Sequence, residues 1–298
     1  MSQTTKAGYV AIVGRPNSGK STLMNAILDY KLSIVTPKAQ TTRKKVAGIY
    51  STDETQIVFL DTPGIIKADY EMHKSMMSYV QNSVEEADVL IVIIDAANYD
   101  ISKGFDKMIN SYINSYEGPK ILLLNKTDKL ADKKTLLPLM AFMQQEGGFN
   151  DIVPISALKK DNLDSVIEII SKYIPEGPFF YDPEQLSTES QRFFVSEFIR
   201  EQVFYRFKEE VPYSIEVIIN EFKERESGKW YISAEIIVER ESQKKIIIGK
   251  NGEKIKELGK YSRKEIEKHL GFEIYLELFV KVRDDWRNNK TLLKSYGY

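Results

Sequence analysis

The sequence predicts an α/β protein of two parts, a larger domain with a mainly parallel β-sheet and a smaller α+β domain after it. Two observations carry this prediction. Short apolar runs alternate with amphipathic segments from residue 8 to about residue 174, as in sheets that helices cover on both faces. A stretch rich in proline and glycine then ends the alternation. We place the first domain at residues 1–176, a linker at 177–187 and the second domain at 188–298.

The composition is that of a globular protein and excludes several kinds of chemistry. The chain has 298 residues, 42% of them hydrophobic and 29% charged, and no cysteine, so disulfides and thiol catalysis are excluded. His73 and His269 are isolated in the sequence, and we expect both on the surface rather than at a zinc site. The net charge of −1 gives no general attraction to nucleic acid. Without a signal-peptide pattern or an apolar run of about 18 residues, we expect a cytoplasmic chain and, by default, a monomer.

The first predicted strand, residues 8–13, leads into a loop with the pattern G-x-x-x-x-G-K-[ST]. Backbone N–H groups of such a loop surround the β-phosphate of a nucleotide, Lys20 reaches the β- and γ-phosphates, and the Ser21 hydroxyl can bind Mg²⁺. A helix over residues 22–28 follows, and its N-terminus favours anions. By itself the loop leaves ATP and GTP equally open. The predicted nucleotide-binding residues here are Gly14, Arg15, Pro16, Asn17, Ser18, Gly19, Lys20, Ser21 and Thr22.

The next strand, residues 56–60, ends at Asp61, which therefore lies at the carboxyl edge of the sheet, where it can hold Mg²⁺ through water. Gly64 has no side chain, so its N–H can approach the γ-phosphate and be released when that phosphate leaves. Thr41 and Thr42 are both candidates for the hydroxyl that joins Mg²⁺ when GTP is bound, and we prefer Thr42. The predicted catalytic residues are Lys20, Thr42 and Gly64, and the predicted Mg²⁺ ligands are Ser21, Thr42 and Asp61.

The strand at residues 120–124 is followed by Asn125, Lys126, Thr127 and Asp128. The Asp128 carboxylate can accept two hydrogen bonds from the N1–H and the exocyclic amine of guanine, whereas adenine has no matching pair of donors. Lys126 can lie along the face of the purine. These residues predict GTP and GDP as the ligands, and a metabolic P-loop kinase is disfavoured because no second substrate site is visible.

Three further segments complete the first domain. These are a strand at residues 88–94, a strand at 151–155 and a helix at 162–170. Ser156 and Ala157 follow the second of these strands and can place a backbone N–H on the carbonyl oxygen of guanine. With them the pattern describes a P-loop GTPase domain.

The second domain reads as a helix at about residues 189–208, two strands at about 213–222 and 230–239, a long amphipathic helix, and a strand at 272–281. A break at Ser227 and Gly228 predicts that the two strands form a hairpin. The pattern G-x-x-G occurs at residues 249–252. The two glycines are predicted to lie between two helices, and the resulting order, αββααβ, is similar to that of a KH domain of type II.

The G-x-x-G loop is the predicted centre of RNA binding. Its glycines allow the backbone to approach a sugar-phosphate chain, and Lys250 and Asn251 offer a charge and an amide to phosphate or base. Residues 246–248 are predicted to form an apolar platform, and Lys and Arg outnumber Glu in residues 244–268. We expect single-stranded RNA as the ligand. The predicted RNA-binding residues are Lys244, Lys245, Ile248, Gly249, Lys250, Asn251, Gly252 and Lys254.

Residues 14–22, 39–43 and 61–64 resemble the Era group of translation-factor-class GTPases, and the resemblance extends through residues 238–246 and 276–282. It is this resemblance that implies a role in small ribosomal subunit assembly and binding to the 3′ end of small-subunit ribosomal RNA. It also implies peripheral association with the inner face of the cell membrane. The alternative is a GTPase whose output is a protein or membrane partner.

Two residues bear on the rate of GTP hydrolysis. Ile65 stands where Ras-like proteins have a glutamine that orients the attacking water, so intrinsic hydrolysis should be slow. Asn17 occupies the place at which related proteins hold K⁺ near the phosphates, and a K⁺ site here is a hypothesis; the alternative is that Asn17 only stabilises the loop. Arg43 is expected to be a surface charge.

Overall fold

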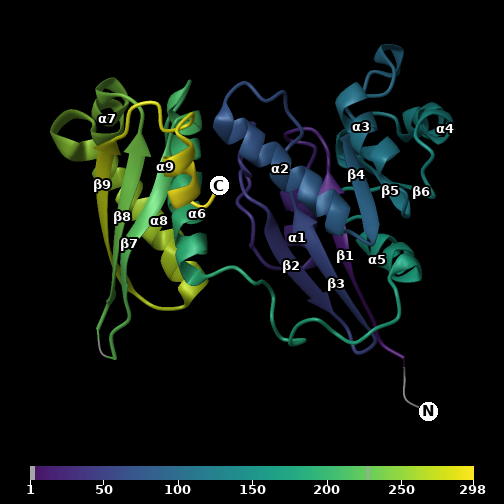
Figure 1. Ribbon diagram of the computed structural model, residues 1–298, viewed down its shortest axis with the longest axis horizontal. Coiled ribbons are helices and arrows are strands. Elements are labelled where there is room, and N and C mark those ends of the chain that lie inside the picture. Colours follow the sequence, from purple (N-terminus) through teal and green to yellow (C-terminus); the bar gives the residue numbers. More distant parts are fainter. Residues whose placement is uncertain (1–3, 227) are drawn as a thin grey trace. The chain divides into compact units, whose positions relative to one another are not determined.

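The computed structural model describes residues 4–226 and 228–298, which form two compact units (Figure 1). One unit contains the described residues up to 68 together with residues 73–188, and the other contains residues 69–72 and 189–298. Ser227, part of the predicted hairpin break, lies outside the described residues.

The helices and strands alternate through the first unit and change their order in the second. In chain order, the elements are β1 (Lys6–Val13), α1 (Lys20–Ile27), β2 (Val46–Ser51), β3 (Thr55–Asp61), α2 (Glu71–Glu86), β4 (Val89–Asp95), α3 (Lys107–Ser115), β5 (Lys120–Asn125), α4 (Leu136–Glu146), β6 (Asp151–Pro154), α5 (Leu163–Tyr173), α6 (Gln191–Arg206), β7 (Glu216–Lys223), β8 (Trp230–Val238), α7 (Glu241–Ile248), α8 (Glu253–Leu270), β9 (Ile274–Val282) and α9 (Lys290–Ser295). Short 3-10 helices lie at Ile101–Lys103, Thr127–Lys129, Lys133–Thr135, Val211–Tyr213 and Lys250–Gly252.

The first unit is built on a six-stranded sheet with the order β2-β3-β1-β4-β5-β6. All neighbouring strands are parallel except β2, which runs antiparallel to β3 and was not among the predicted strands. The prediction of a mainly parallel sheet is therefore confirmed. Because parallel strands share one carboxyl edge, the residues that follow β1, β3, β5 and β6 meet there.

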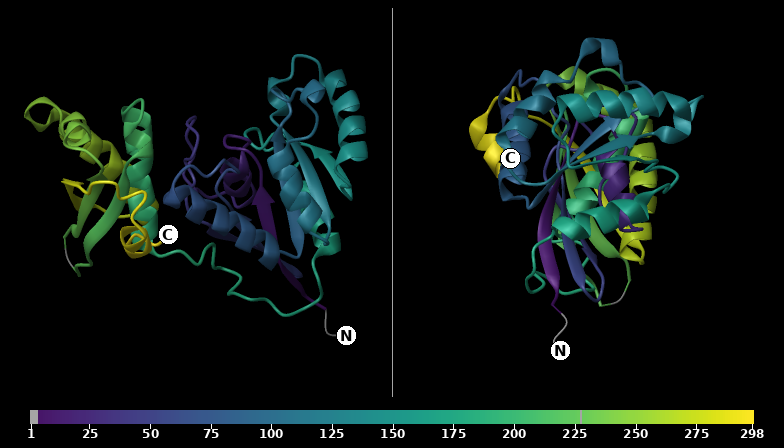
Figure 2. Two further views of the ribbon diagram at one scale, coloured as in Figure 1. Left: turned by 45° about the horizontal axis from the view of Figure 1, so that its top comes forward. Right: turned by 90° about the vertical axis from the view of Figure 1, so that its right-hand side faces the viewer.

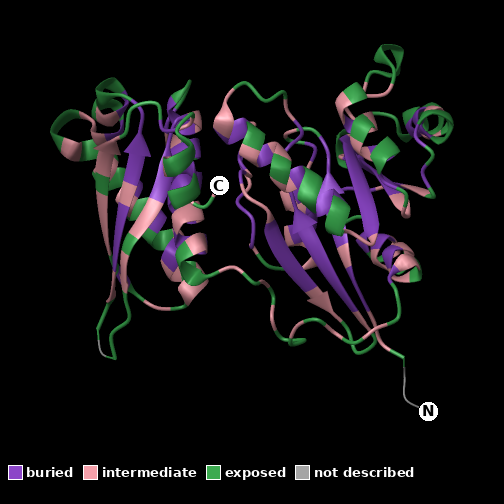
Figure 3. Ribbon diagram, viewed as in Figure 1, coloured by how far each residue is buried: buried purple, intermediate pink, exposed green. Residues whose placement is uncertain are grey.

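The core of this unit lies between the sheet and its helices, which occupy both faces (Figures 1 and 2). Val92 of β4 packs in one cluster with Val80 of α2, Ile109 of α3 and Leu139 of α4. The strands are almost entirely buried, whereas α2 has an exposed side (Figure 3). A parallel sheet buried on both faces accounts for the continuous apolar runs in the sequence.

The predicted linker, residues 177–187, is extended, and it packs against the sheet of the first unit. The amide of Gln56, a fully buried side chain, accepts hydrogen bonds from the backbone N–H groups of Phe180 (2.8 Å) and Tyr181 (3.0 Å). Farther along, the Ile49 N–H donates to the Leu186 carbonyl at 2.9 Å. The segment is thus held by buried polar contacts that its proline-rich composition did not indicate.

The second unit contains a three-stranded sheet with the order β7-β8-β9, in which β7 and β8 are antiparallel and β8 and β9 are parallel. Helices α6 and α8 pack against each other and against β7 and β9, respectively. After β9, Trp286 is fully buried and its indole N–H donates to the Ser214 carbonyl at 3.0 Å. The order α6-β7-β8-α7-α8-β9 confirms the αββααβ prediction. Within the described residues, no helix has the combination of length and hydropathy that a bilayer-spanning segment needs.

Candidate functional site

The glycine-rich loop connects β1 to α1 at the carboxyl edge of the sheet, and two of its glycines are required by close contacts. Gly19 has φ 107°, and a Cβ atom there would lie 2.1 Å from the side-chain nitrogen of Asn125. A Cβ atom at Gly14 would lie 2.3 Å from the carbonyl oxygen of Ile93. Only glycine fits both positions, which brings the backbone N–H groups of the loop together at the start of α1.

Lys20 is 5% exposed, and its ammonium group points back into the loop. It donates to the carbonyl oxygens of Gly14 (3.1 Å) and Arg15 (2.9 Å). Burial lowers the pKa of Lys20 to about 8, an effect that the nearby Asp61 carboxylate opposes. At neutral pH the group is therefore still charged, and poorly hydrated, which favours exchange of its carbonyl partners for phosphate oxygens.

Three predicted metal ligands converge at the end of β3. The Ser21 hydroxyl lies 2.7 Å from Asp61 Oδ2 and 2.9 Å from Thr42 Oγ1. Asp61 is fully buried, and its Oδ1 accepts no hydrogen bond from the described residues. Burial raises the pKa of Asp61, while the Ser21 hydroxyl and the Lys20 charge lower it. Two hydroxyls and a carboxylate with an unpaired oxygen fit Mg²⁺, which prefers hard oxygen ligands.

The structure distinguishes between the two threonines that the sequence left open. Thr42 lies beside Ser21, whereas Thr41 donates to the carbonyl of Lys38 at 2.7 Å and shares a hydrogen bond with the Thr36 hydroxyl. Thr42 is therefore the residue placed to join a metal ion with Ser21.

The predicted base-binding residues form a linked group at the ends of β5 and β6. Asp128 Oδ1 accepts a hydrogen bond from the Ser156 hydroxyl at 2.6 Å, which orients the carboxylate. Asn125 donates to the Ser18 carbonyl at 2.8 Å and accepts from the Ala157 N–H at 3.0 Å. Asn125 thus ties the phosphate loop to the segment after β6.

Lys126 and Asn17 connect the base side to the phosphate side. The Lys126 ammonium donates to the Asn17 carbonyl at 2.6 Å and pairs with Asp95 at 2.8 Å. The side-chain amide of Asn17, a residue with φ 62°, donates to the Pro37 carbonyl at 3.0 Å. Asn17 therefore bridges the phosphate loop and the segment that leads to Thr42.

The backbone N–H groups of Ser156 and Ala157 were predicted to reach the carbonyl oxygen of guanine, and this stays a prediction. In the structure, the Ser156 N–H donates to the Asp161 carbonyl and the Ala157 N–H to Asn125. Both groups are already paired within the protein. A hydrogen bond from either to guanine would have to share or replace these bonds.

Gly64 and Ile65 lie directly against the phosphate loop. A Cβ atom at Gly64 would lie 2.7 Å from the backbone nitrogen of Pro16, and the Ile65 N–H donates to the Gly14 carbonyl at 3.0 Å. The Ile65 side chain is fully buried in the apolar core with Val80. It is therefore directed into the protein interior and offers no hydrogen bond for an attacking water.

Two charged or titratable residues, Arg43 and His73, differ from their predicted positions. Arg43, expected on the surface, is 1% exposed, and His73, also expected there, is 3% exposed. The Arg15 guanidinium contacts Asp106 and the Ile65 carbonyl, and the prediction that Arg15 binds nucleotide stays a prediction. Each outcome depends on contacts between distant segments, which local sequence patterns do not reveal.

In the second unit, the G-x-x-G loop joins α7 to α8 through three residues with positive φ. These are Gly249 (71°), Asn251 (51°) and Gly252 (78°). Lys250 and Asn251 are exposed at the loop. The predicted apolar platform at residues 246–248 is only partly available, because Ile247 is fully buried while Ile246 is 40% exposed.

A groove of about 330 Å³ runs between α8 and β9, next to this loop. Its apolar part comes from Ile255, Leu276 and Leu278, and its charged part from cations of α8. A Cβ atom at Gly259 would lie 3.6 Å from Leu278, so this glycine keeps the helix side of the groove open. No sequence motif marks these residues, although the spacing of the cations along one helical face was a usable signal. The cations are Lys256, Lys260 and Arg263.

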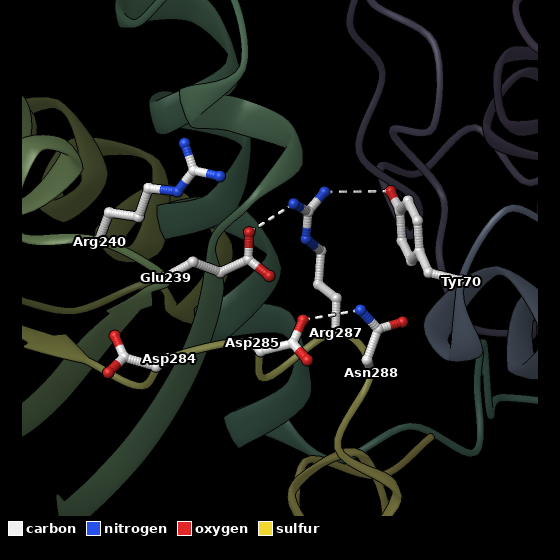
Figure 4. Close-up of a pocket in the computed structure, with 7 residues that line it drawn as sticks. All are labelled: Tyr70, Glu239, Arg240, Asp284, Asp285, Arg287 and Asn288. Carbon is white, nitrogen blue, oxygen red and sulfur yellow. Dashed lines mark hydrogen bonds and ion pairs between the residues drawn. The ribbon is translucent and has the colours of Figure 1, made fainter.

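A second pocket of the same unit, of about 300 Å³, has a different character (Figure 4). The Arg287 guanidinium pairs with Glu239 and donates to the Tyr70 hydroxyl at 3.2 Å. Asp284 and Asp285 also line the pocket (Figure 4). Arg240 lines this pocket too, but Arg287 is already paired and three carboxylates, those of Glu239, Asp284 and Asp285, surround the space, so the pocket does not favour a phosphate chain.

The two units define a class of protein. A phosphate loop, a metal site of two hydroxyls and Asp61, and the Asn125 to Asp128 base site form a P-loop GTPase domain, and the G-x-x-G unit is a KH domain. The family model of 50S ribosome-binding GTPases matches residues 9–126, and that of KH domains matches residues 210–287.

Solved structures agree over nearly the full length. A variant of Era from Aquifex aeolicus bound to GDP.AlF4- is 42% identical, with a TM-score of 0.92 and coverage of 99% of each chain. A structure of Era in complex with MgGDPNP and nucleotides 1506–1542 of 16S ribosomal RNA gives the same identity, coverage and TM-score. The chain belongs to the Era family of GTPases.

Proposed function

We propose that this GTPase binds GTP with Mg²⁺ and uses its nucleotide state to control the binding of single-stranded RNA near the 3′ end of small-subunit ribosomal RNA. The protein would carry out this RNA binding during assembly of the small ribosomal subunit. The observation that carries the proposal is the apolar, cation-lined groove beside the G-x-x-G loop, in a chain that also has a complete guanine-nucleotide site. The Era structure with MgGDPNP and a 16S ribosomal RNA fragment supports the same pairing of ligands.

In this function the nucleotide is held at three places. Lys20 and the N–H groups at the start of α1 bind the phosphates, and Asp128, oriented by Ser156, reads the base. Ser21, Thr42 and Asp61 would hold Mg²⁺, which supplies charge neutralisation at the β- and γ-phosphates. Loss of the γ-phosphate frees Thr42 and Gly64, the residues that change position between the two states.

Hydrolysis by this site should be slow without help. Ile65 is buried in the core and cannot orient a water molecule. A cation beside the phosphates would compensate, and we propose K⁺ held by Asn17. The side-chain amide nitrogen of Asn17 donates to the Pro37 carbonyl. The side-chain oxygen of Asn17, Oδ1, is therefore the atom that can ligate the ion.

Replacing K⁺ by Na⁺ at equal ionic strength is expected to lower kcat by at least about 10-fold, and the roughly 10³- to 10⁵-fold contribution of an arginine finger sets the upper limit of the effect. The measurement is GTP hydrolysis at saturating nucleotide in each salt. Asn17→Gly should be slow in both salts, since it lacks the ligand but adopts the φ of 62° without strain. Equal rates for the natural chain in K⁺ and Na⁺ would rule out the ion.

The proposal predicts that RNA binding depends on the nucleotide. A labelled single strand matching the small-subunit ribosomal 3′ end should bind more tightly with a non-hydrolysable GTP analogue than with GDP, and a scrambled strand should bind weakly in both. Fluorescence anisotropy at a stated salt concentration measures this, because phosphate contacts make affinity salt-dependent. Equal, weak binding in both states would favour the second candidate, a protein or membrane partner.

We also propose that the protein acts in the cytoplasm as a monomer, with peripheral association on the inner face of the cell membrane. The resemblance to the Era group supports this location. Cell fractionation tests it, and complete recovery of the chain in the soluble fraction would argue against the membrane.

A further inference from the structure

Arg15 of the phosphate loop is held by the beginning of α3, far away in the sequence. Its guanidinium makes a two-point contact with Asp106, through Nε to Oδ2 and through Nη2 to Oδ1, the latter at 3.0 Å. Asp106 also caps α3, because its Oδ1 accepts the N–H groups of Met108 (2.9 Å) and Ile109 (3.3 Å). The guanidinium is therefore anchored to the end of a helix in a fixed, forked geometry.

From this anchored position Arg15 reaches the segment that contains Gly64. Its Nη1 donates to the Ile65 carbonyl at 3.2 Å, while the Ile65 N–H donates to the Gly14 carbonyl at 3.0 Å. The peptide groups on both sides of Ile65 are thus bonded to the phosphate loop. Gly64 also lies close to the backbone of Pro16. The position of Gly64 relative to the loop is therefore restrained by this close approach and by the two hydrogen bonds of Ile65.

The predicted metal ligands are close together in the same structure as the Arg15 contacts. In the same structure, Ser21 lies 2.9 Å from Thr42 and 2.7 Å from Asp61. The Arg15 contacts therefore occur together with this cluster of predicted metal ligands. A contact that is stronger in one of two states shifts the equilibrium toward that state.

We propose that Arg15, anchored by Asp106, is a positioning residue that holds Gly64 in place for the γ-phosphate and so favours GTP over GDP. The inference rests on the guanine-nucleotide function proposed above and adds the regulation of its site. The role is separable from folding. The Arg15 side chain is 44% exposed and that of Asp106 is 19% exposed, and ion pairs of such exposure contribute little to overall stability.

The test compares Arg15→Ala, Asp106→Asn and the double variant with the natural chain. The measurements are the Kd for GDP, the Kd for a non-hydrolysable GTP analogue and single-turnover hydrolysis of GTP. Arg15→Ala should weaken the binding of the analogue by about 3- to 10-fold while changing the GDP affinity by less than about 2-fold, since the hydrogen bond to the Ile65 carbonyl comes from a partly exposed side chain and has roughly ordinary strength. The hydrolysis rate at saturating GTP should fall by a similar factor.

Asp106→Asn is the sharper variant because asparagine caps a helix as well as aspartate does. It should shift the GTP-to-GDP preference in the same direction by a smaller factor, and the double variant should be no worse than Arg15→Ala alone, because the two residues act through one contact. Arg15→Lys should restore only part of the preference, since an ammonium group lacks the fork. Lys229→Ala, which removes the exposed ion pair with Glu273 in the second unit, is the control and should change nothing.

The outcomes separate this inference from the proposed function. If Arg15→Ala lowered the affinities for GDP and for the analogue equally, Arg15 would bind nucleotide directly. That result would overturn the positioning role. Unchanged affinities and rate would overturn it as well. Failure of the natural chain to bind guanine nucleotides would overturn the proposed function itself, and the inference with it.

Discussion

Asp128→Asn is expected to lower the affinity for GTP and GDP by about 10²- to 10⁴-fold and to make xanthine nucleotides the preferred ligands. The carboxylate accepts hydrogen bonds from the N1–H and the amine of guanine, whereas the asparagine amide presents a donor to one of them. Each charged hydrogen bond contributes about 1.5–3 kcal/mol. Xanthine has a carbonyl in place of the amine, so it matches the donor of asparagine. The Ser156 hydroxyl, 2.6 Å from Asp128 Oδ1, can still orient the new side chain.

Competition against a fluorescent guanine nucleotide, with GTP, XTP and ATP as competitors, measures this change. Asp132→Asn is a matched control in the same domain, because Asp132 accepts the Lys134 N–H and lies outside the base site. The control should keep the guanine preference. An Asp128→Asn variant that still prefers GTP over XTP would show that the base is read elsewhere.

Lys250→Glu with Asn251→Gly is expected to reduce RNA affinity by at least about 10²-fold while leaving GTP affinity unchanged. The change replaces a phosphate partner by a repelling charge and removes an amide at the G-x-x-G loop. Glycine is chosen because Asn251 has φ 51°, a conformation that alanine adopts only with strain. The loop shape is thereby kept while its chemistry is lost.

Anisotropy with the small-subunit ribosomal 3′ strand and the GTP analogue gives the affinity, and nucleotide competition gives the integrity of the first domain. Lys229→Glu is the matched control, since it makes the same charge change in the same unit outside the groove-lining residues. RNA affinity within about 2-fold of the natural chain would favour a protein or membrane partner. The slope of log affinity against log salt concentration should also fall by about 1, the value for one lost phosphate contact, and this result would support the loop as the site.

The sequence by itself determined the elements in which local spacing carries the chemistry. The phosphate loop, Asp61, Asp128 and the G-x-x-G loop each follow or join predicted elements, and the parallel sheet brings the first three to one edge. Their residue types follow from short-range needs, such as glycine at φ 107° in the loop. Such needs are visible in a few consecutive residues.

Only the tertiary structure decided which distant residues meet and which charged groups are buried. Arg15 and Asp106 pair across 91 positions in the sequence, Arg43 and His73 lie inside although their types favour the surface, and Gln56 is satisfied by the backbone of the predicted linker. The groove proposed for RNA needs α8 and β9 side by side. Burial and long-range contact depend on the packing of the whole chain, whereas sequence patterns report only the preferences of neighbouring residues.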